Sequence, residues 1–491
     1  MNGPRQRIVL PAPEHPRVSV IIPAWRRPDL LRRCLASLAR HRANCASFET
    51  VILLNGATPE VASVVSDETE GARVVHSRVN LGFGRGSNRA ARKATGEFLV
   101  LLNDDTEVQE GWLDALVQAA DAHPSAGAVG SRMVSYDGRL LEAGGLVWRE
   151  AVGSHVGRGL PESTNHYRFL REVDYCSASS LLVRRTTWDA VGGFDERYFP
   201  GYYEDVDLCL SIRRLGQQIL FQPRSCVRHF ESGSLDWDSP YKDFIASRSQ
   251  AQFVSKWSAE LERFPALPGT DDLWESSIVG ERALLAARRL SRRILVVDCG
   301  GGPARDSSRL ASAVVDLAGR RAAVSVFIDG RTDPSGYFAD RGVEVLDGEL
   351  VAHLSGPFSY DAVLFRRAAG FEAYSPAVRA LQPLAAVLYD VEDATSEVLQ
   401  LPEAARSAAG SPVIRADRVL CATAFDASLL TMVPGRAPLA LVAPPSEPQA
   451  KPQGGSPWAP VTQSWADAVR AARWDVLRGR RGDRACGGRR P

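Results

Sequence analysis

The stretch FLVLLNDDT, residues 98–106, decides the fold. Its five apolar residues, 98–102, are typical of a strand that is covered on both faces of a parallel sheet. The polar residues that follow, Asn103, Asp104 and Asp105, then lie at the carboxyl end of that strand, where open α/β sheets bind their ligands. The stretch therefore predicts both a layered α/β fold and the edge at which a ligand binds.

Outward from this strand, apolar runs alternate with helical patterns. Strands are predicted at 18–23 and 50–54. One helix is predicted to start at Pro28, where leucines recur at helical spacing, and another near Ser87. Alternating strands and helices are typical of a doubly wound sheet. The expected fold class is therefore α/β with a mostly parallel sheet.

Changes of composition along the chain predict its domains. Residues 1–16 are proline-rich and are predicted to be a flexible leader, followed by a first α/β domain over 17–262. A linker and helix are predicted over 263–292, and a second α/β domain over 293–444. Residues 445–491, rich in Pro, Gly and Arg, are predicted to be a disordered tail. The strands predicted in the second domain are 293–298, 323–328, 343–346, 362–365, 386–390, 418–421 and 439–442.

The overall composition is that of an ordinary globular protein. The 491 residues are 45% hydrophobic and 24% charged. The net charge of +1 argues neither for nor against a nucleic-acid partner, because binding requires a basic patch, and no nucleic-acid partner is expected. Eight cysteines without a CxxC pair indicate reduced thiols of a cytosolic protein. No run reaches the roughly 18 apolar residues of a membrane span. We expect a cytoplasmic protein, and peripheral docking at the inner face of the cell membrane stays open.

A second acidic cluster follows about a hundred residues after the first. The segment YYEDVD, residues 202–207, places Glu204, Asp205 and Asp207 at the start of a predicted helix. Helix capping explains one acid there, but three exceed what capping needs. Crowding of like charges and partial burial should raise the pKa of one carboxyl, as a general base near neutral pH requires.

A histidine and a glycine-rich turn complete the candidate set. His229 follows a strand-like run, although a lone histidine is more often structural than a metal ligand. The glycines of NLGFGRGSN, residues 80–88, would let the backbone approach a diphosphate beside Arg85, and a ligand-free turn is the alternative. Asn103 to Asp105 fits an Asx turn as well as a site for Mg²⁺ or Mn²⁺.

Five segments stand out in chain order: residues 18–38, 80–108, 192–199, 202–216 and 227–234. Together they resemble an inverting family 2 glycosyltransferase of GT-A fold, with its rhamnosyltransferase-like branch the most similar. Residues 293–444 are similar to the N-terminal, Rossmann-like half of a family 4 glycosyltransferase of GT-B fold.

The first resemblance implies transfer from a nucleotide-diphospho-sugar donor to a saccharide or lipid-linked glycan acceptor in cell-surface polysaccharide synthesis. It implies that Asp105 and His229 hold a divalent cation, Mg²⁺ or Mn²⁺, and that Asp205 is the catalytic base with Glu204 as its neighbour. The residues implied to bind the donor are Pro23, Ala24, Asn55, Asn80, Gly82, Arg85, Asn88, Asn103 and Asp104. Those implied to bind the acceptor are Gly193, Asp195 and Tyr203.

The alternative is a degenerate protein that binds a sugar nucleotide or acts as a scaffold without turnover. Leu54 stands where the family usually has an acid that touches the nucleotide base, and the second half of the GT-B fold is missing. Both acidic clusters and His229 favour the enzyme.

Overall fold

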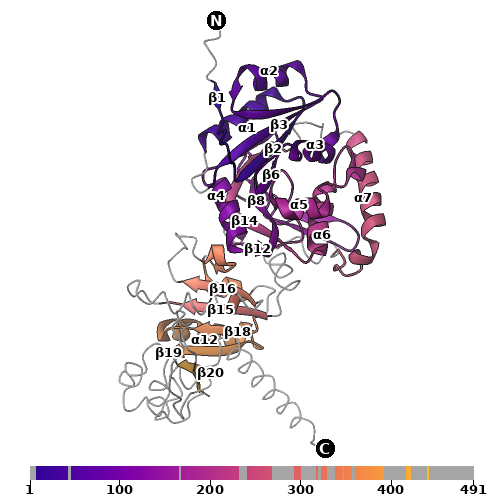
Figure 1. The fold of residues 1–491 in the computed structure, drawn as a ribbon. Helices are drawn as coiled ribbons and strands as arrows, with labels where there is room; N and C mark the ends of the chain where they lie inside the picture. The colour runs from indigo at the N-terminus through magenta and orange to yellow at the C-terminus, as the bar shows by residue number, and fades with distance from the viewer. Residues whose placement is uncertain are drawn as a thin grey trace, which may run out of the picture. The chain divides into compact units, whose positions relative to one another are not determined.

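The computed structural model divides the chain into two compact units, Met1–Asp272 and Leu273–Pro491. Each unit contains one large sheet (Figure 1). The described residues are 7–41, 46–164, 167–231, 240–267, 292–299, 314, 317–318, 322–328, 338–346, 348–355, 360–391, 416–421 and 439–441. The disordered tail predicted over 445–491 and the helix predicted in the linker lie outside these residues. No helix among the described residues has the length and apolar character needed to cross a bilayer.

The first unit is built on a ten-stranded mixed sheet with the order β12-β14-β8-β13-β6-β2-β3-β5. Strands β2 (Val18–Ala24), β3 (Phe48–Asn55), β5 (Ala72–Ser77) and β6 (Phe98–Leu102) run parallel, as predicted. The sheet is mixed because β13 (Ser180–Arg184) runs antiparallel to β6 and to β8 (Ala126–Val134). The α/β class is therefore confirmed, with antiparallel strands added on one side.

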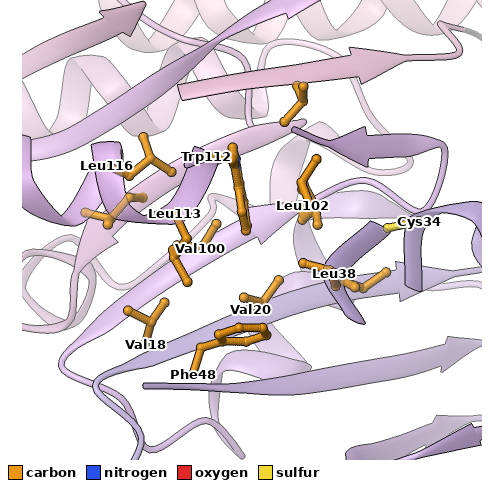
Figure 2. Close-up of a cluster of buried hydrophobic side chains, with 14 of the residues drawn as sticks. Val18, Val20, Cys34, Leu38, Phe48, Val100, Leu102, Trp112, Leu113 and Leu116 are labelled. Carbon is orange, nitrogen blue, oxygen red and sulfur yellow. The ribbon is translucent and has the colours of Figure 1, made fainter. Parts of the chain in front are cut away.

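Helices cover both faces of this sheet, which explains the continuous apolar runs of its strands. Every residue of β3 and β6 is buried. Figure 2 shows part of the core, in which Val18, Val20, Val100 and Leu102 of β2 and β6 form one apolar cluster with Cys34, Leu38, Trp112, Leu113 and Leu116. The helices are α1 (Pro28–Arg40), α2 (Pro59–Asp67), α3 (Gly82–Ala91), α4 (Trp112–Ala122), α5 (Arg185–Val191), α6 (Glu204–Arg214) and α7 (Pro240–Leu261).

The remaining strands of the first unit are short, except for the last one. They are β1 (Ile8–Val9), β4 (Thr69–Glu70), β7 (Thr106–Val108), β9 (Leu140–Glu142), β10 (Gly145–Val147), β11 (Gly153–His155), β12 (Arg171–Glu172) and β14 (Gln218–His229). Strands β7 and β9 join the large sheet by pairing with β14 and β8, and β10 pairs with β11 in a separate hairpin.

Two local predictions are corrected. The segment 1–16 is not a flexible leader throughout, because Ile8 pairs with Thr69 and Leu10 is buried. The helix predicted near Ser87 begins at Gly82, because the side chain of Asn80 accepts a hydrogen bond from the Gly82 amide (2.8 Å) and starts the helix earlier.

The second unit contains a seven-stranded sheet that is parallel throughout, with the order β17-β16-β15-β18-β19-β20-β21. The chain leaves β15 on one side and returns on the other at β18, so the order reverses there as in Rossmann-like folds. Each of the seven predicted strands is present. They are β15 (Arg292–Asp298), β16 (Ala322–Ile328), β17 (Glu344–Leu346), β18 (Ala362–Phe365), β19 (Ala386–Val391), β20 (Arg418–Cys421) and β21 (Leu439–Leu441).

Alternate residues of these strands belong to two different apolar clusters. Leu295 and Val297 lie in one cluster, whereas Ile294 and Val296 lie in the other. Because successive side chains point to opposite faces of a sheet, both faces are buried. The described helices include α11 (Leu350–Leu354) and α12 (Ala368–Leu381).

Candidate active site

The first acidic cluster lies where the chain leaves β6. Asp104 and Asp105 are 7% and 6% exposed. The Trp25 amide, just after β2, donates a hydrogen bond to Asp104 Oδ2 (3.3 Å). Burial, together with the charge of Asp105, raises the pKa of Asp104 to about 7. Two adjacent buried carboxylates of this kind favour the approach of a cation.

The structure brings His229 to this cluster from the end of β14. Antiparallel pairing of β14 with β7 places His229 opposite Thr106. Its Nε2 lies 3.0 Å from Asp105 Oδ1, although the two residues are 124 positions apart, and the Phe230 amide donates to the Asp105 carbonyl (2.9 Å). Burial opposes a charge on His229, but the charge and hydrogen bond of Asp105, together with the charges of Glu231 and Glu142, outweigh burial and raise the histidine's pKa.

These residues fit a divalent cation that is shared with a substrate. Among the described residues, no three His, Cys, Asp or Glu side chains gather closely enough to form a metal shell by themselves. Mg²⁺ and Mn²⁺ sites of enzymes that act on phosphates commonly use one or two carboxylates and complete the shell with phosphate oxygens and water. Asp105 and His229 would supply the protein ligands, since carboxylate and imidazole both suit Mn²⁺. Nearby, the amide oxygen of Asn103 is buried and has no hydrogen-bond partner among the described residues.

The second acidic cluster lies at the first turn of α6. Tyr202 and Tyr203 precede it in the left-handed backbone region, with φ of +68° and +69°. Burial and the charge of Asp205 raise the pKa of Glu204 well above its usual range, and its Oε2 has no hydrogen-bond partner among the described residues. Burial and the charge of Glu142 raise the pKa of Asp205, whose Oδ1 accepts the Val206 amide (2.8 Å).

Asp207, two residues further on, has a structural role. Its Oδ1 accepts hydrogen bonds from the Tyr198 hydroxyl (2.9 Å) and the Trp257 ring nitrogen (2.7 Å), and its Oδ2 accepts one from Lys256 (2.8 Å). Because Trp257 and Lys256 belong to α7, Asp207 fastens α7 to α6. Of the three acids in this helical turn, Asp207 is thus bonded to three side chains, whereas Glu204 Oε2 has no hydrogen-bond partner among the described residues.

Several residues predicted to bind the donor shape the backbone around the site. Asn55 Nδ2 donates to Asn80 Oδ1 (3.1 Å) and to the Gly82 carbonyl (3.0 Å), while the Leu81 amide donates to Asn55 Oδ1 (2.8 Å). Asn55 thus connects the end of β3 to the turn before α3. Pro23 and Ala24 end β2 and are half-buried and buried, respectively.

The side chain of Asn88 fastens α3 to the segment before α6. It donates to the Phe194 carbonyl and accepts from the Phe194 amide, both at 2.9 Å. Gly193 has a φ of +75°, and a Cβ there would lie 2.5 Å from Asn88 Oδ1. Glycine is therefore required at this close approach.

Three further predicted residues have partners within the protein. Arg85 Nε lies 3.3 Å from Glu196 Oε2. Asp195 accepts a hydrogen bond from Lys256 (2.9 Å), and the Tyr203 hydroxyl donates to the Ala151 carbonyl (2.8 Å). Contacts of these residues with a donor or an acceptor stay predictions.

Sequence reasoning missed Glu142 and His155. Glu142 ends β9 and is 1% exposed, and its Oε1 accepts the Ser177 amide (3.0 Å). Its Oε2 lies 2.8 Å from His155 Nδ1, without the alignment of a hydrogen bond. The available signal was an acid inside the largely apolar stretch LLEAGG, residues 140–145.

Comparison with known proteins agrees with the expected family and enzyme class. The sequence profile described as "Glycosyl transferase family 2" matches residues 19–188. The chain is 30% identical over 231 residues to N-acetylglucosaminyl-diphospho-decaprenol L-rhamnosyltransferase of Mycobacterium tuberculosis, covering 42% of this chain and 74% of that protein. These matches, together with the α/β fold, define the class of the protein as a glycosyltransferase. The chain belongs to glycosyl transferase family 2, as predicted.

Other relatives match over smaller shares of their length. The chain is 31% identical over 250 residues to O-antigen biosynthesis protein RfbC of Myxococcus xanthus, covering 49% of this chain and 19% of that protein. Among solved structures, GalNAc-T7 with UDP, GalNAc and Mn²⁺ is similar at a TM-score of 0.39 and 16% identity, over 51% of this chain and 49% of that one. The chain thus spans about a fifth of RfbC and about half of GalNAc-T7.

Proposed function

We propose that the first unit is an inverting, metal-dependent glycosyltransferase. It moves a sugar from a nucleotide-diphospho-sugar to a hydroxyl of a saccharide or lipid-linked glycan in the synthesis of a cell-surface polysaccharide. The observation that carries the proposal is the meeting of Asp105 and His229 at the carboxyl end of β6, where Oδ1 and Nε2 lie 3.0 Å apart. Transfer away from a diphosphate needs a charge-neutralising site beside a base.

Asp205 is the proposed base. It takes the proton of the acceptor hydroxyl while the acceptor oxygen forms its bond to the anomeric carbon and the bond from that carbon to the diphosphate breaks. Because the oxygen attacks opposite the leaving diphosphate, the configuration inverts. The raised pKa of Asp205 suits proton transfer near neutral pH. Asp105 and His229 would hold the cation, which supplies neutralisation of the departing diphosphate when bound.

The partners follow from this chemistry and from the relatives' names. We propose a lipid-linked glycan as one acceptor class, because one relative is named as a transferase to a diphospho-decaprenol-linked sugar. A lipid-linked acceptor would place the protein at the inner face of the cell membrane, as a peripheral protein. The family 4 resemblance of residues 293–444 also stays a proposal.

The substitution Asp205→Asn tests the base. We expect kcat to fall by about 10²–10⁴-fold, because the amide cannot accept the proton. Donor binding should persist, measured as the rise in melting temperature with nucleotide sugars and Mn²⁺. Asp137→Asn, at a side chain that is 66% exposed, is the matched control. Near-normal turnover of Asp205→Asn would show that another group is the base.

Chelation tests the cation. Excess EDTA should abolish transfer, and Mn²⁺ or Mg²⁺ should restore it. Asp105→Asn should raise the concentration of cation needed for half-maximal rate. A full rate in EDTA would contradict the metal role. Donor binding without turnover over a panel of acceptors would instead identify a protein that binds sugar nucleotides without transferring them.

A further inference from the structure

The segment that runs from β5 through α3 is uniformly basic. Residues 72–96 contain six Lys or Arg residues and no Asp or Glu, although the chain as a whole carries 59 bases and 58 acids. All six are exposed, namely Arg73, Arg78, Arg85, Arg89, Arg92 and Lys93. Such a concentration of one charge in an otherwise balanced chain indicates an anionic partner for this surface.

Four of these bases follow one face of α3 and continue just past its carboxyl end. They are Arg85, Arg89, Arg92 and Lys93, at positions i, i+4, i+7 and i+8, which lie on the same side of a helix. The other side of α3 is buried and includes Gly86, Ser87, Asn88, Ala90 and Ala91. From Arg85 to Arg92 the helix rises by about 10 Å, so one diphosphate held at Arg85 would leave the other three bases unused.

Acids of the protein neutralise only part of this charge. Arg85 Nε lies 3.3 Å from Glu196 Oε2, and Arg73 Nε lies 3.1 Å from Glu49 Oε2. Arg89 donates to a backbone carbonyl (2.8 Å). Within the described part of the chain, no ion pair is formed by the remaining three, Arg78, Arg92 and Lys93. Two acids for six bases leave the surface positive.

Exposed hydrophobic side chains adjoin the bases at the amino-terminal end of α3. The Arg85 guanidinium lies over the Phe199 ring, 5.3 Å from its centroid. Arg248 of α7 donates to the Phe199 carbonyl, and Phe244 lies one turn earlier on α7. Figure 1 shows α3 and α7 on the same side of the first unit. The large hydrophobic side chains on this surface are Val79, Phe199, Tyr241 and Phe244, with exposed fractions of 62%, 40%, 57% and 62%.

The combination fits a membrane surface better than a folded protein or a nucleic acid. The three rings offer roughly 300 Å² of surface at these exposures, well below the ~800 Å² that each partner buries in a standard protein interface. A nucleic acid would use the bases and rings but gains little from Val79. A bilayer uses all of them, because anionic head groups attract the bases while apolar side chains enter the interface singly.

We propose that this surface docks the protein on an anionic membrane through Arg78, Arg89, Arg92, Lys93, Phe199, Tyr241 and Phe244. The inference deepens the proposed function and rests on it in one respect, since a lipid-linked acceptor stays in the bilayer. The Ser249 hydroxyl of α7 donates to the Gly201 carbonyl (3.0 Å), which connects α7 to the segment just before Glu204 and Asp205. Docking at this surface brings the proposed base to the bilayer that holds the acceptor.

Co-sedimentation of the full-length protein with vesicles tests the basic part of the surface. The vesicles contain phosphatidylcholine either alone or mixed with phosphatidylglycerol, and the wild type should bind the anionic mixture more tightly. A triple variant, Arg89→Gln, Arg92→Gln and Lys93→Gln, should lower the partition coefficient by about 100-fold, since each base contributes roughly fivefold near an anionic surface. Glutamine retains a high helix propensity, and melting curves would verify that the variant is folded.

A matched control removes the same charge from exposed positions on other elements. It consists of Arg40→Gln, Arg139→Gln and Arg224→Gln, and its partition coefficient should stay close to that of the wild type. The arginine-rich residues 470–491 are the same in every protein compared, so the difference between the two triple variants reports the contribution of α3.

The apolar part of the surface has its own test. Phe244→Ser should lower the partition coefficient by about tenfold, because a ring that enters the interface is lost. Raising NaCl from about 0.1 M to about 1 M shortens the Debye length from about 10 Å to 3 Å. At the higher salt the wild type and the basic triple variant should bind alike, whereas Phe244→Ser should still bind more weakly than either.

Several outcomes would overturn the docking surface. One is equal binding by the two triple variants, and another is equal binding of the wild type to both kinds of vesicle. Binding of the wild type to single-stranded RNA or DNA, without binding to vesicles, would assign the surface to a nucleic acid instead. Because the vesicle assay contains no donor, acceptor or cation, a wild type that docks but transfers no sugar would count against the proposed function alone.

Discussion

The two units both place charged residues at the carboxyl ends of parallel strands, but they balance these charges differently. In the second unit, Asp298 ends β15 and Asp390 lies in β19. Arg366, 1% exposed, lies 3.1 Å from Asp298 and 3.7 Å from Asp390, and Arg367 Nε lies 3.0 Å from Asp298. Arg366, which follows β18, thus pairs with acids of the two neighbouring strands, β15 and β19. We interpret this cluster as one that holds the strands together.

In the first unit, the acids that follow β6 and begin α6 are less completely matched, with His229 lying 3.0 Å from Asp105. Asp104 and Asp105 adjoin each other, and Glu204 is buried beside Asp205 with its Oε2 unpartnered among the described residues. Such crowding costs stability unless a ligand or cation relieves it. Acids occur at the strand ends of both units. What differs is whether basic side chains neutralise them, and we expect a reactive site where they do not.

The largest effect on stability is expected in the second unit. Arg366→Met should destabilise it by about 3–5 kcal/mol, because two acids lose their buried partner. Denaturant unfolding with a probe in that unit would measure the change. A loss below about 1 kcal/mol would show that Arg366 does not clamp the strands.

Within the first unit, replacing Asp207 should likewise lower stability. Asp207→Asn should destabilise the unit by about 2 kcal/mol, since hydrogen bonds from Tyr198, Trp257 and Lys256 lose their charged acceptor. Unfolding followed by tryptophan fluorescence would report it. If stability stayed unchanged, the attachment of α7 would depend on apolar packing alone.

Removing the charge of Glu204, whose Oε2 has no hydrogen-bond partner among the described residues, should increase stability. Glu204→Gln should stabilise the unit by about 1 kcal/mol at pH 8, while transfer activity falls. The folded-state pKa of Glu204 is raised, so ionisation at this position costs stability as the pH rises above the unfolded-state value of about 4.3. The gain should therefore be larger at pH 8 than at pH 5. Equal melting curves of both proteins at both pH values would contradict it.

The smallest effect provides the baseline. The exposed pair of Arg139 and Asp137 should contribute at most about 0.5 kcal/mol, so Asp137→Asn should leave stability nearly unchanged by the same denaturant measurement. A larger change there would mean that charge removal alone perturbs this protein, and the contrast between Arg366 and Glu204 would lose its meaning.

The sequence predicts the sheets well because a strand that is buried on both faces is a continuous run of apolar residues. The runs at 98–102 and 294–297 are continuous apolar stretches, and both are strands. The short strand β1 forms no such run, since it consists of two residues whose burial depends on pairing with β4.

The site is only partly predictable for the same reason. Asp105 and Asp205 stand in motifs, and the structure places each in an acidic cluster. Glu142 and His155 belong to no motif, because their meeting depends on how β9 and β11 are placed by the chain between them. The spacing of residues along the sequence does not predict contacts between segments that are brought together only by the fold.

The pairing of β7 with β14 has a consequence for the candidate cation site. His229 faces Thr106 by strand register, and a slip of one residue would turn its side chain to the opposite face of the sheet. The distance between Asp105 and His229 thus depends on the hydrogen bonds between β7 and β14. Such a site is lost cooperatively when these hydrogen bonds open, so amide exchange at Thr106 and His229 should report the integrity of the cation site without any cation present.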